Sequence, residues 1–433
     1  MAEVYDRWHL SRPPKVAEGE PAPQPCEHVA GGKPLYPSAE HGAPKRWQVR
    51  WRDHARRQRK ENFAKRSQAQ TRADTVAADL ARGLYVDPAA GKESFRAVAE
   101  RWRTAAVHRE QTADRVRRGL ENHIYPVFGD RPIMSIRASE IQAWIKDRST
   151  VLAPSTLAIV YSYMASVFRT AEKDRLIGAN PCKDLKAPKN PKTKVVPLEP
   201  AAVLALADAV PEWYRAAILL AAGSGARQGE VFGLEVEHVD FLRREMTLRQ
   251  QVISPDRGDP YIGELKTPES YRTVPLAPAV VEALSAHLAR FPARPVELED
   301  RTDPRRVVRR QAWLVFTNER REAIRRAAWS RVWAVAVRNA NRALAESGVE
   351  VGGRPVQIPA GTTMHDLRHF YASLLIKHRE SVKTVQVRLG HRTPSITLDT
   401  YTHLWPEAED TTRDAVQGIL AGVPEKCPPA AQN

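Results

Sequence analysis

The spacing of hydrophobic and polar positions changes several times along the chain, and each change suggests a new element. Residues 46–52 alternate polar, mostly basic, side chains with apolar ones, which places two tryptophans and a valine on one face, and this period of two is typical of a half-buried strand. A second short strand is expected to open at Phe63, and the spacing over residues 71–84 predicts a helix. The pattern therefore predicts a small strand–strand–helix module over residues 45–88.

Basic side chains are dense on the polar face of the first strand and at the turn expected after it. Clustered arginine and lysine residues interleaved with aromatic ones favour a DNA-contacting sheet, whereas a solvated edge strand is the simpler interpretation of a charge run. The residues expected to contact DNA are Arg46, Arg50, Arg52, Arg56, Arg57, Arg59 and Lys60.

Residues 94–188 change to the helical period. Apolar side chains recur every three or four positions, as on the buried face of an amphipathic helix. The longest helix is expected from about Ser155 until a Gly-Ala-Asn-Pro stop near residue 178, and its aromatic stripe is interpreted as core. A helical domain is therefore predicted, followed by a linker of lysine and proline residues over 189–197.

From residue 198 to 423 helical and strand patterns alternate. The expected fold class is mixed α/β: a mainly helical domain with a small antiparallel sheet here, the helical domain before it, and the sheet-plus-helix module at the start. The helices are expected at 203–209, 214–222, 280–289 and 327–347, with a hairpin-like region at 246–276 and a charged insertion at 292–310. Residues 1–43 are predicted to be a flexible leader, because they are rich in proline and glycine, and 424–433 a tail.

Charge narrows the range of partners. The chain of 433 residues has a formal net charge of +16, and a protein this basic usually meets a polyanion, most often nucleic acid. Charge alone also fits a role in solubility or a contact with acidic lipid. No stretch approaches the roughly 20 apolar residues of a membrane span, and residues 1–14 lack a signal-peptide core, so a cytoplasmic protein is expected. The three cysteines are far apart, which argues against a disulfide framework and a thiolate zinc site.

Four motifs follow one another in the last part of the chain. The first is the segment Gly-Ala-Arg-Gln-Gly-Glu, which contains Arg227. The second contains Lys266, which precedes a turn expected between two short strands. Neither motif is specific by itself. The glycines near Arg227 do not have the spacing of a dinucleotide-binding fingerprint.

The third motif is His-Asp-Leu-Arg-His, in which His365 and Arg368 lie three residues apart and share one helical face. His369 is also placed for a metal site with His365, but zinc proteases need glutamate where this chain has Asp366. The fourth motif combines Leu-Gly-His with a later Thr-Tyr-Thr-His. A single histidine or tyrosine of this kind is usually structural.

In this order the residues resemble the tyrosine recombinases, the family that includes phage integrases. The family pattern of Arg, Lys, His-x-x-Arg, His or Trp, and Tyr is met over residues 198–423 by Arg227, Lys266, His365, Arg368, His391 and Tyr401. Residues 94–188 also resemble the family's core-DNA-binding domain, and residues 45–88 its arm-type DNA-binding domain.

The resemblance implies cutting and rejoining of DNA through a bond between a 3′-phosphate and Tyr401. Arg227 and Arg368 would hold the non-bridging phosphate oxygens, which guanidinium groups match in geometry, and His391 would donate to the phosphate. Lys266 would protonate the leaving 5′-oxygen, with His365 as acid–base partner. Neither metal nor nucleotide is then required, so no cofactor is expected.

The expected partners are double-stranded DNA attachment sites and three further copies of the chain in a homotetramer, with room left for accessory DNA-bending and excision factors. Residues 407–420, after the nucleophile, are expected either to pack in trans on a neighbouring subunit or to close their own domain. Two other functions use similar features. A type IB topoisomerase has similar chemistry but no such basic module, and a DNA-binding protein without catalysis would be expected to lack at least one of the six residues.

Overall fold

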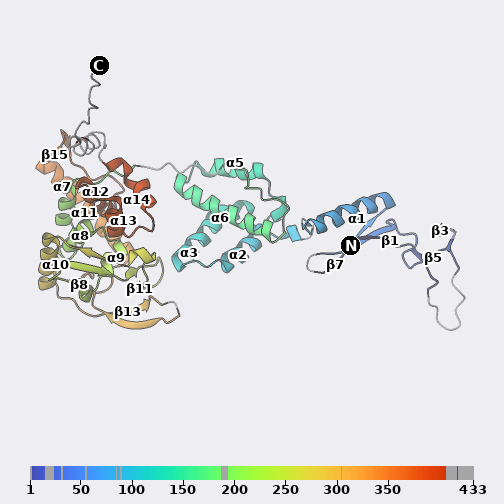
Figure 1. Cartoon of the computed structure of the whole chain (residues 1–433), viewed down its shortest axis with the longest axis horizontal. Coiled ribbons are helices and arrows are strands. Elements are labelled where there is room, and N and C mark those ends of the chain that lie inside the picture. Colours follow the sequence, from blue (N-terminus) through green and yellow to red (C-terminus); the bar gives the residue numbers. More distant parts are fainter. Residues whose placement is uncertain are drawn as a thin grey trace, which may run out of the picture. The chain divides into compact units, whose positions relative to one another are not determined.

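The computed structural model describes residues 2–14, 24–30, 33–53, 56–83, 85–87, 90–186, 194–303, 305–405 and 417. The chain divides into two compact units, residues 1–192 and 193–433. Both units combine helices with small sheets (Figure 1), which confirms the expected mixed α/β architecture.

The first unit contains a three-stranded antiparallel sheet in the order β1-β6-β7, with α1 packed on one face. Val49 and Trp51 of the central strand are buried against Ala73 and Val76 of the helix. The alternating pattern therefore predicted the buried face of this strand correctly. The elements are β1 (Glu3–Asp6), β6 (Trp47–Arg52), β7 (Gln58–Phe63) and α1 (Arg66–Ala81).

The structure differs from the sequence-based expectation at two places in this sheet. Phe63 ends β7 instead of opening a strand, because it pairs with Trp47 at the start of β6. Residues 3–6, expected within a flexible leader, form β1 and pair with β6; such short strands leave too little periodicity to be seen in the sequence. Residues 1–43, the expected leader, contribute two further antiparallel strand pairs, β2 (His9–Leu10) with β5 (Tyr36–Pro37) and β3 (Val29–Ala30) with β4 (Lys33–Pro34).

Residues 95–173 form the predicted helices around one apolar core. The longest helix buries Leu157, Met164 and Phe168 in that core, so its apolar stripe is confirmed as structural. The next helix upstream begins after Arg137, since Glu140 accepts a hydrogen bond from the Arg137 backbone N–H at 2.9 Å. The helices are α2 (Phe95–Ala105), α3 (Glu110–Gly119), a π-helical turn (Leu120–Ile124), α4 (Tyr125–Phe128), α5 (Ala138–Arg148) and α6 (Pro154–Lys173).

The second unit is mainly helical. In its core α8 packs against α7, α10 and α12, and α11 packs against α7. The four helices expected before residue 348 are all present and extend a few residues beyond the apolar positions that predicted them. The helices are α7 (Pro200–Ala209), α8 (Glu212–Ser224), α9 (Gln228–Phe232), α10 (Pro278–Arg290), α11 (Arg326–Ser347), α12 (Met364–Lys377), α13 (Val382–Leu389) and α14 (Pro394–Tyr401).

The hairpin-like region forms two nested strand pairs in different sheets. The inner pair is β10 with β11 and the outer pair is β9 with β12, while β8 extends the outer sheet. The charged insertion is itself a hairpin of β13 and β14, and β13 joins β11 in parallel. The strands are β8 (Val239–Asp240), β9 (Glu245–Leu248), β10 (Gln251–Ile253), β11 (Tyr261–Gly263), β12 (Arg272–Pro275), β13 (Val296–Arg301), β14 (Val308–Ala312), β15 (Glu350–Val351) and β16 (Arg354–Pro355).

In the part of the chain that the structure describes, every helix is too short or too polar to cross a membrane. The segment 407–420, for which packing in trans was one expectation, lies outside the described residues apart from Gln417.

Candidate active site

A sharp turn after α8 places the first candidate arginine. Gly225 ends this helix with φ +67°, and a Cβ at this position would lie 2.5 Å from Tyr371 Cδ1, so only glycine fits. Two residues later Arg227 is the N-cap of α9. The carboxylate of Glu230 accepts hydrogen bonds from the backbone N–H of Arg227 at 2.9 Å and from its Nη1 at 2.7 Å.

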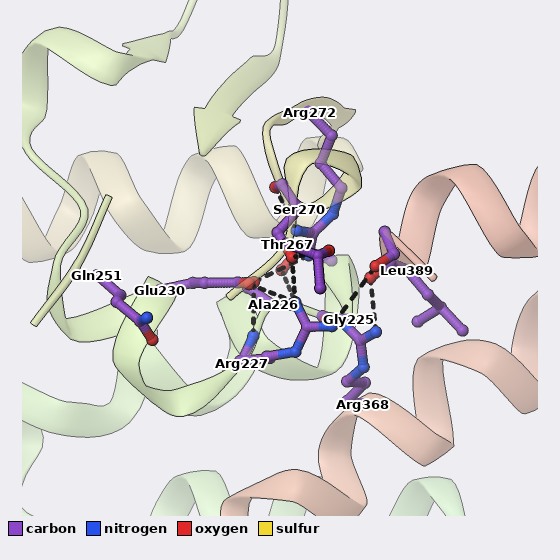
Figure 2. A network of polar contacts seen from close by, with 12 residues as sticks. Gly225, Ala226, Arg227, Glu230, Gln251, Thr267, Ser270, Arg272, Arg368 and Leu389 are labelled. Carbon is purple, nitrogen blue, oxygen red and sulfur yellow. Dashed lines mark hydrogen bonds and ion pairs between the residues drawn. The ribbon is translucent and has the colours of Figure 1, made fainter. Parts of the chain in front are cut away.

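A buried carboxylate links two arginines from different elements (Figure 2). Glu230 is 1% exposed and also accepts from Nη2 of Arg272 on β12 at 2.9 Å. Burial alone would raise the pKa of Glu230, but Arg272 and Arg227 hold that pKa below its usual value. Arg272 also donates to the carbonyl oxygen of Arg388 at 2.8 Å, while Arg227 donates to Ser270 Oγ at 3.0 Å. The network thus joins α9, the β11–β12 loop and α13.

Arg368 comes from α12 and is 2% exposed. Its Nη1 donates to the carbonyl oxygen of Gly225 at 2.7 Å, and its Nη2 donates to that of Leu389 at 2.5 Å. Burial, followed by the charge of Arg227, lowers the pKa of Arg368 to about 9, so its guanidinium remains charged at neutral pH. Figure 2 shows its guanidinium next to that of Arg227 and directed at Leu389.

The charges in this network do not balance. Three guanidinium groups, those of Arg227, Arg272 and Arg368, surround one carboxylate, that of Glu230. A buried excess of positive charge is unfavourable without an anion. Because the Arg227 side chain keeps 24% of its surface exposed, the site offers a charged fork to a bound anion, and guanidinium groups match phosphate oxygens in geometry.

Two of the predicted histidines lie around these arginines. His391 follows Gly390, and its Nδ1 lies 2.9 Å from the hydroxyl of Thr397 on α14. Burial, together with the charges of Arg368 and Arg227, lowers the pKa of His391 to about 3. His365 keeps contact with solvent near the start of α12, but the protein atoms crowded around it, with His369 and Arg368, lower its pKa as well. Both imidazoles are therefore neutral at pH 7.

Tyr401 ends α14 and is 1% exposed. Its hydroxyl lies 2.8 Å from Nδ1 of His369, and its ring stacks on that of His391 with centroids 6.4 Å apart. Burial raises the pKa of Tyr401 to about 12, against the opposing influence of Arg368. A neutral hydroxyl next to a neutral imidazole is an arrangement in which the imidazole can accept the phenolic proton.

The sequence interpretation assigned no catalytic role to His369. This histidine was considered only as a metal ligand with His365, and the two rings are indeed 4.8 Å apart. Asp366 stands where a zinc protease needs glutamate. Its carboxylate caps α12 by accepting a hydrogen bond from the backbone N–H of Thr363 at 2.7 Å. The roles of Arg272 and Glu230 were also missed, because each depends on a partner distant in sequence.

Lys266 is the sixth predicted residue and stands apart from the others. It is exposed in the loop between β11 and β12, and no hydrogen bond or ion pair connects it to the described part of the chain. Five of the six residues therefore gather around the arginine network and Tyr401, whereas Lys266 is exposed on a loop whose end, at Ser270, contacts Arg227.

The seven basic residues predicted to contact DNA fall into two groups. Arg46 donates to Asp6, and both Arg57 and Arg59 pair with Asp53. Arg50, Arg52 and Lys60 instead lie exposed on the outer face of the sheet, where Arg50 and Lys60 are cross-strand partners. Arg56 is exposed in the β6–β7 turn with φ +60°.

Comparison with known proteins gives the family. Residues 197–407 match the model described as "Phage integrase family", and residues 95–188 match "Phage integrase central domain". The integrase of Mycobacterium phage FRAT1 is 28% identical over 282 residues, covering 64% of this chain and 73% of that protein. A putative prophage phiRv2 integrase of Mycobacterium tuberculosis is 25% identical over 339 residues, covering 74% and 78%.

Solved structures share the fold. The Tn1549 transposon integrase in complex with transposon right-end DNA aligns with a TM-score of 0.61 at 21% identity, over 76% of this chain and 100% of that one. A lambda integrase tetramer bound to a Holliday junction aligns with a TM-score of 0.53 at 17% identity, over 86% and 97%. Together with the site, these matches establish that the chain belongs to the phage integrase family and is a site-specific tyrosine recombinase.

Proposed function

We propose that this recombinase integrates and excises a mobile element by forming a 3′-phosphotyrosyl bond through Tyr401. The observation that carries the proposal is the position of the Tyr401 hydroxyl, 2.8 Å from the His369 nitrogen and close enough to Arg368 for that charge to influence its pKa. A nucleophile with an adjacent base and a cationic phosphate site is the arrangement that phosphoryl transfer requires.

The proposed step moves two protons. The Tyr401 oxygen bonds to phosphorus while its proton passes to Nδ1 of His369, and the bond from phosphorus to the 5′-oxygen breaks as Lys266 protonates that oxygen. Arg227 and Arg368 stabilise the charge that develops on the non-bridging oxygens. The phosphotyrosyl bond preserves the energy of the broken phosphodiester, so rejoining needs no nucleotide.

Two histidines complete the proposed site. Nδ1 of His391 lies 2.9 Å from the Thr397 hydroxyl. In the proposed tautomer this hydroxyl donates to Nδ1, so a neutral His391 carries its proton on Nε2 and can donate to a phosphate oxygen. His365, at the solvent-facing start of α12, would exchange protons with water as the acid–base partner of the reaction. In the full reaction we propose a homotetramer on paired DNA attachment sites.

The decisive experiment compares strand transfer with relaxation. Full-length protein incubated with two attachment sites should give recombinants, and the phosphotyrosyl bond should map to the peptide that contains Tyr401. Relaxation of supercoiled plasmid without recombinants under any site combination would support a topoisomerase-like enzyme instead. The crossover site itself can be found as a short direct repeat that flanks the integrated element and matches a host locus.

Cleavage should not depend on added metal or nucleotide. Because two arginines supply the charge that a metal would otherwise supply, the covalent protein–DNA adduct on a core site should form equally fast with and without excess EDTA. Adduct formation that requires Mg²⁺ at saturating protein, when binding is already complete, would contradict the mechanism.

The pH profile should reflect neutral histidines. Burial lowers the pKa of His369, with Arg368 acting in the same direction and Asp366 opposing it, so Nδ1 remains an acceptor until the pH falls below the usual histidine value of about 6.5. The single-turnover cleavage rate should therefore stay level from about pH 8 to about 6.5 and decline below it. An acid limb with a midpoint at or above neutral pH, with DNA binding unchanged, would exclude His369 as the acceptor.

The N-terminal sheet is proposed to bind arm-type DNA sites through its outer face. Arg50, Arg52 and Lys60 are exposed there, and strands can enter the major groove with such side chains. Each neutralised phosphate releases condensed counterions, so the slope of log affinity against log salt should decrease by about 0.9 per lost contact.

Two double variants test this surface with equal loss of charge. Arg52→Ala with Lys60→Ala should reduce the salt slope by about 1.8 on an arm-type site. Arg57→Ala with Arg59→Ala should reduce it less, because Asp53 already pairs with both arginines. Protein lacking residues 1–90 should still cut a minimal core site. Identical footprints from truncated and full-length protein on a complete attachment site would remove the proposed role of the module.

A further inference from the structure

Four side chains with metal-binding atoms meet at the start of the chain, far in sequence from the catalytic residues. His9 belongs to β2, Cys26 and His28 precede β3, and His41 lies in the turn after β5. One donor atom from each of the four lies within 4.8 Å of all the others. The three imidazole rings are mutually close, with centroid separations of 4.9, 5.1 and 5.7 Å.

His9 is oriented as a metal ligand is. Its side chain is 1% exposed, and Nε2 is buried without a hydrogen-bond partner, which is unfavourable for a polar atom inside a protein. Its other nitrogen, Nδ1, lies 2.8 Å from the Asp6 carboxylate. Nδ1 lies closer to this carboxylate, which can only accept, than to Nη2 of Arg46 at 3.3 Å, so Nδ1 carries the proton and Nε2 presents its lone pair. Histidine ligands of metals commonly have such a carboxylate behind them.

The Asp6 carboxylate is itself paired with an arginine. Arg46 donates to Asp6 from two nitrogens, at distances from 2.7 to 3.2 Å. The arginine therefore orients the carboxylate, and the carboxylate in turn orients the histidine.

The backbone of the ligand loops is also ordered by local bonds. The N–H of Cys26 donates to the carbonyl oxygen of Leu35 at 2.9 Å, and that of His41 donates to Ser38 at 3.0 Å. Trp8 packs its ring against His28 and His41, with centroids 6.3 and 5.6 Å away, and its Nε1 donates to the carbonyl oxygen of Ala43 at 2.8 Å. The four ligands are thus brought together by several independent contacts.

We infer that His9, Cys26, His28 and His41 form a structural zinc site. A thiolate and three imidazoles are ligands that Zn²⁺ prefers, and four protein ligands make a closed tetrahedral site. With Zn–N near 2.0–2.1 Å and Zn–S near 2.3 Å, donor atoms in such a site lie about 3.3–3.8 Å apart. Rotations of the exposed His28 and His41 can close the remaining distance of about 1 Å. The sequence interpretation argued against a thiolate zinc site because the three cysteines are far apart. It did not consider a site with a single cysteine, in which histidines supply the other three ligands.

The inferred zinc would connect a segment of little regular structure to the sheet proposed to bind arm-type DNA. Asp6 is the last residue of β1, and β1 pairs with β6. Through Asp6 and Arg46, a metal-bound His9 would fix both the edge strand and the entry to β6. Since metal binding to a site absent from the unfolded chain adds to folding stability, zinc should stabilise this N-terminal sheet specifically.

The test measures metal in full-length, untagged protein after dialysis against zinc and then against metal-free buffer. Wild-type protein should retain about one zinc ion per chain, and Cys26→Ala, His9→Ala and His41→Ala should retain less than about a tenth of that. Two matched controls, Cys427→Ala outside the described residues and His108→Ala on an exposed loop, should keep the wild-type content. Zinc-free wild-type protein, or equal zinc in Cys26→Ala, would overturn the inference.

Cobalt substitution tests the ligand set even if a variant folds poorly. Co²⁺ in the wild-type site should give the strong visible absorption of tetrahedral coordination and a thiolate charge-transfer band. A cobalt protein with neither feature would exclude the proposed ligands. The inference is also separable from the catalytic proposal, because Cys26→Ala should cut a minimal core site at the wild-type rate whether or not Tyr401 is the nucleophile of that cleavage.

Discussion

Replacing Tyr401 by phenylalanine is expected to abolish formation of the covalent protein–DNA adduct while DNA binding remains. The substitution removes the hydroxyl, its contact with His369 and nothing else. Loss of one hydrogen bond costs only about 1 kcal/mol of stability, and the phenyl ring fills the same buried space. A nicked core-site substrate that traps the adduct, separated on a denaturing gel, measures the effect directly.

A matched control is available in the helical domain. Tyr161 is also buried, and its hydroxyl makes a single hydrogen bond, to the Cys182 carbonyl at 3.3 Å. Tyr161→Phe should therefore have a similar effect on stability and none on adduct formation per folded molecule. Recovery of adduct from Tyr401→Phe at any appreciable level would show that another residue is the nucleophile.

Removing the guanidinium of Arg227 or Arg368 is expected to have the second largest effect. Each supplies donors to the charge that develops on phosphorus, and loss of one such donor typically reduces the rate by about 10²–10³, or roughly 3 kcal/mol. Lysine at either position keeps the charge but loses the two-pronged geometry, so Arg227→Lys should recover only part of the rate. Single-turnover cleavage at saturating protein is the appropriate measurement.

The two arginines should differ in their effect on folding. Arg368→Ala leaves the buried carbonyl oxygens of Gly225 and Leu389 without their donor, so it should also lower the melting temperature. Arg227→Ala leaves Glu230 paired with Arg272 and should be the milder change. Arg243→Ala, whose side chain is 82% exposed in the same unit, serves as the control. A near-normal cleavage rate in Arg227→Ala would remove this residue from the site.

The sequence alone was sufficient for properties that depend on near neighbours. The alternation of Trp47, Val49 and Trp51 predicted a half-buried strand because side-chain direction in a strand reverses at every residue. The apolar stripe of α6 predicted a core helix for the corresponding reason at the helical period. Ordered motifs from Arg227 to Tyr401 were enough to predict the family, since the chemistry of phosphoryl transfer restricts the residue types that can occupy these positions.

Tertiary structure decided what depends on partners distant in the chain. Arg272 and Arg227 share Glu230 only because β12 returns beside α9, and the contact between Tyr401 and His369 joins residues 32 positions apart. The same holds at the N-terminus, where residues 1–43 have too little periodicity to predict strands, yet β1 is ordered by pairing with β6. His9, Cys26, His28 and His41 have no recognisable spacing, because their convergence is set by the path of the loops between them. Local periodicity determines which elements form, whereas the identity of a long-range partner depends on how those elements pack.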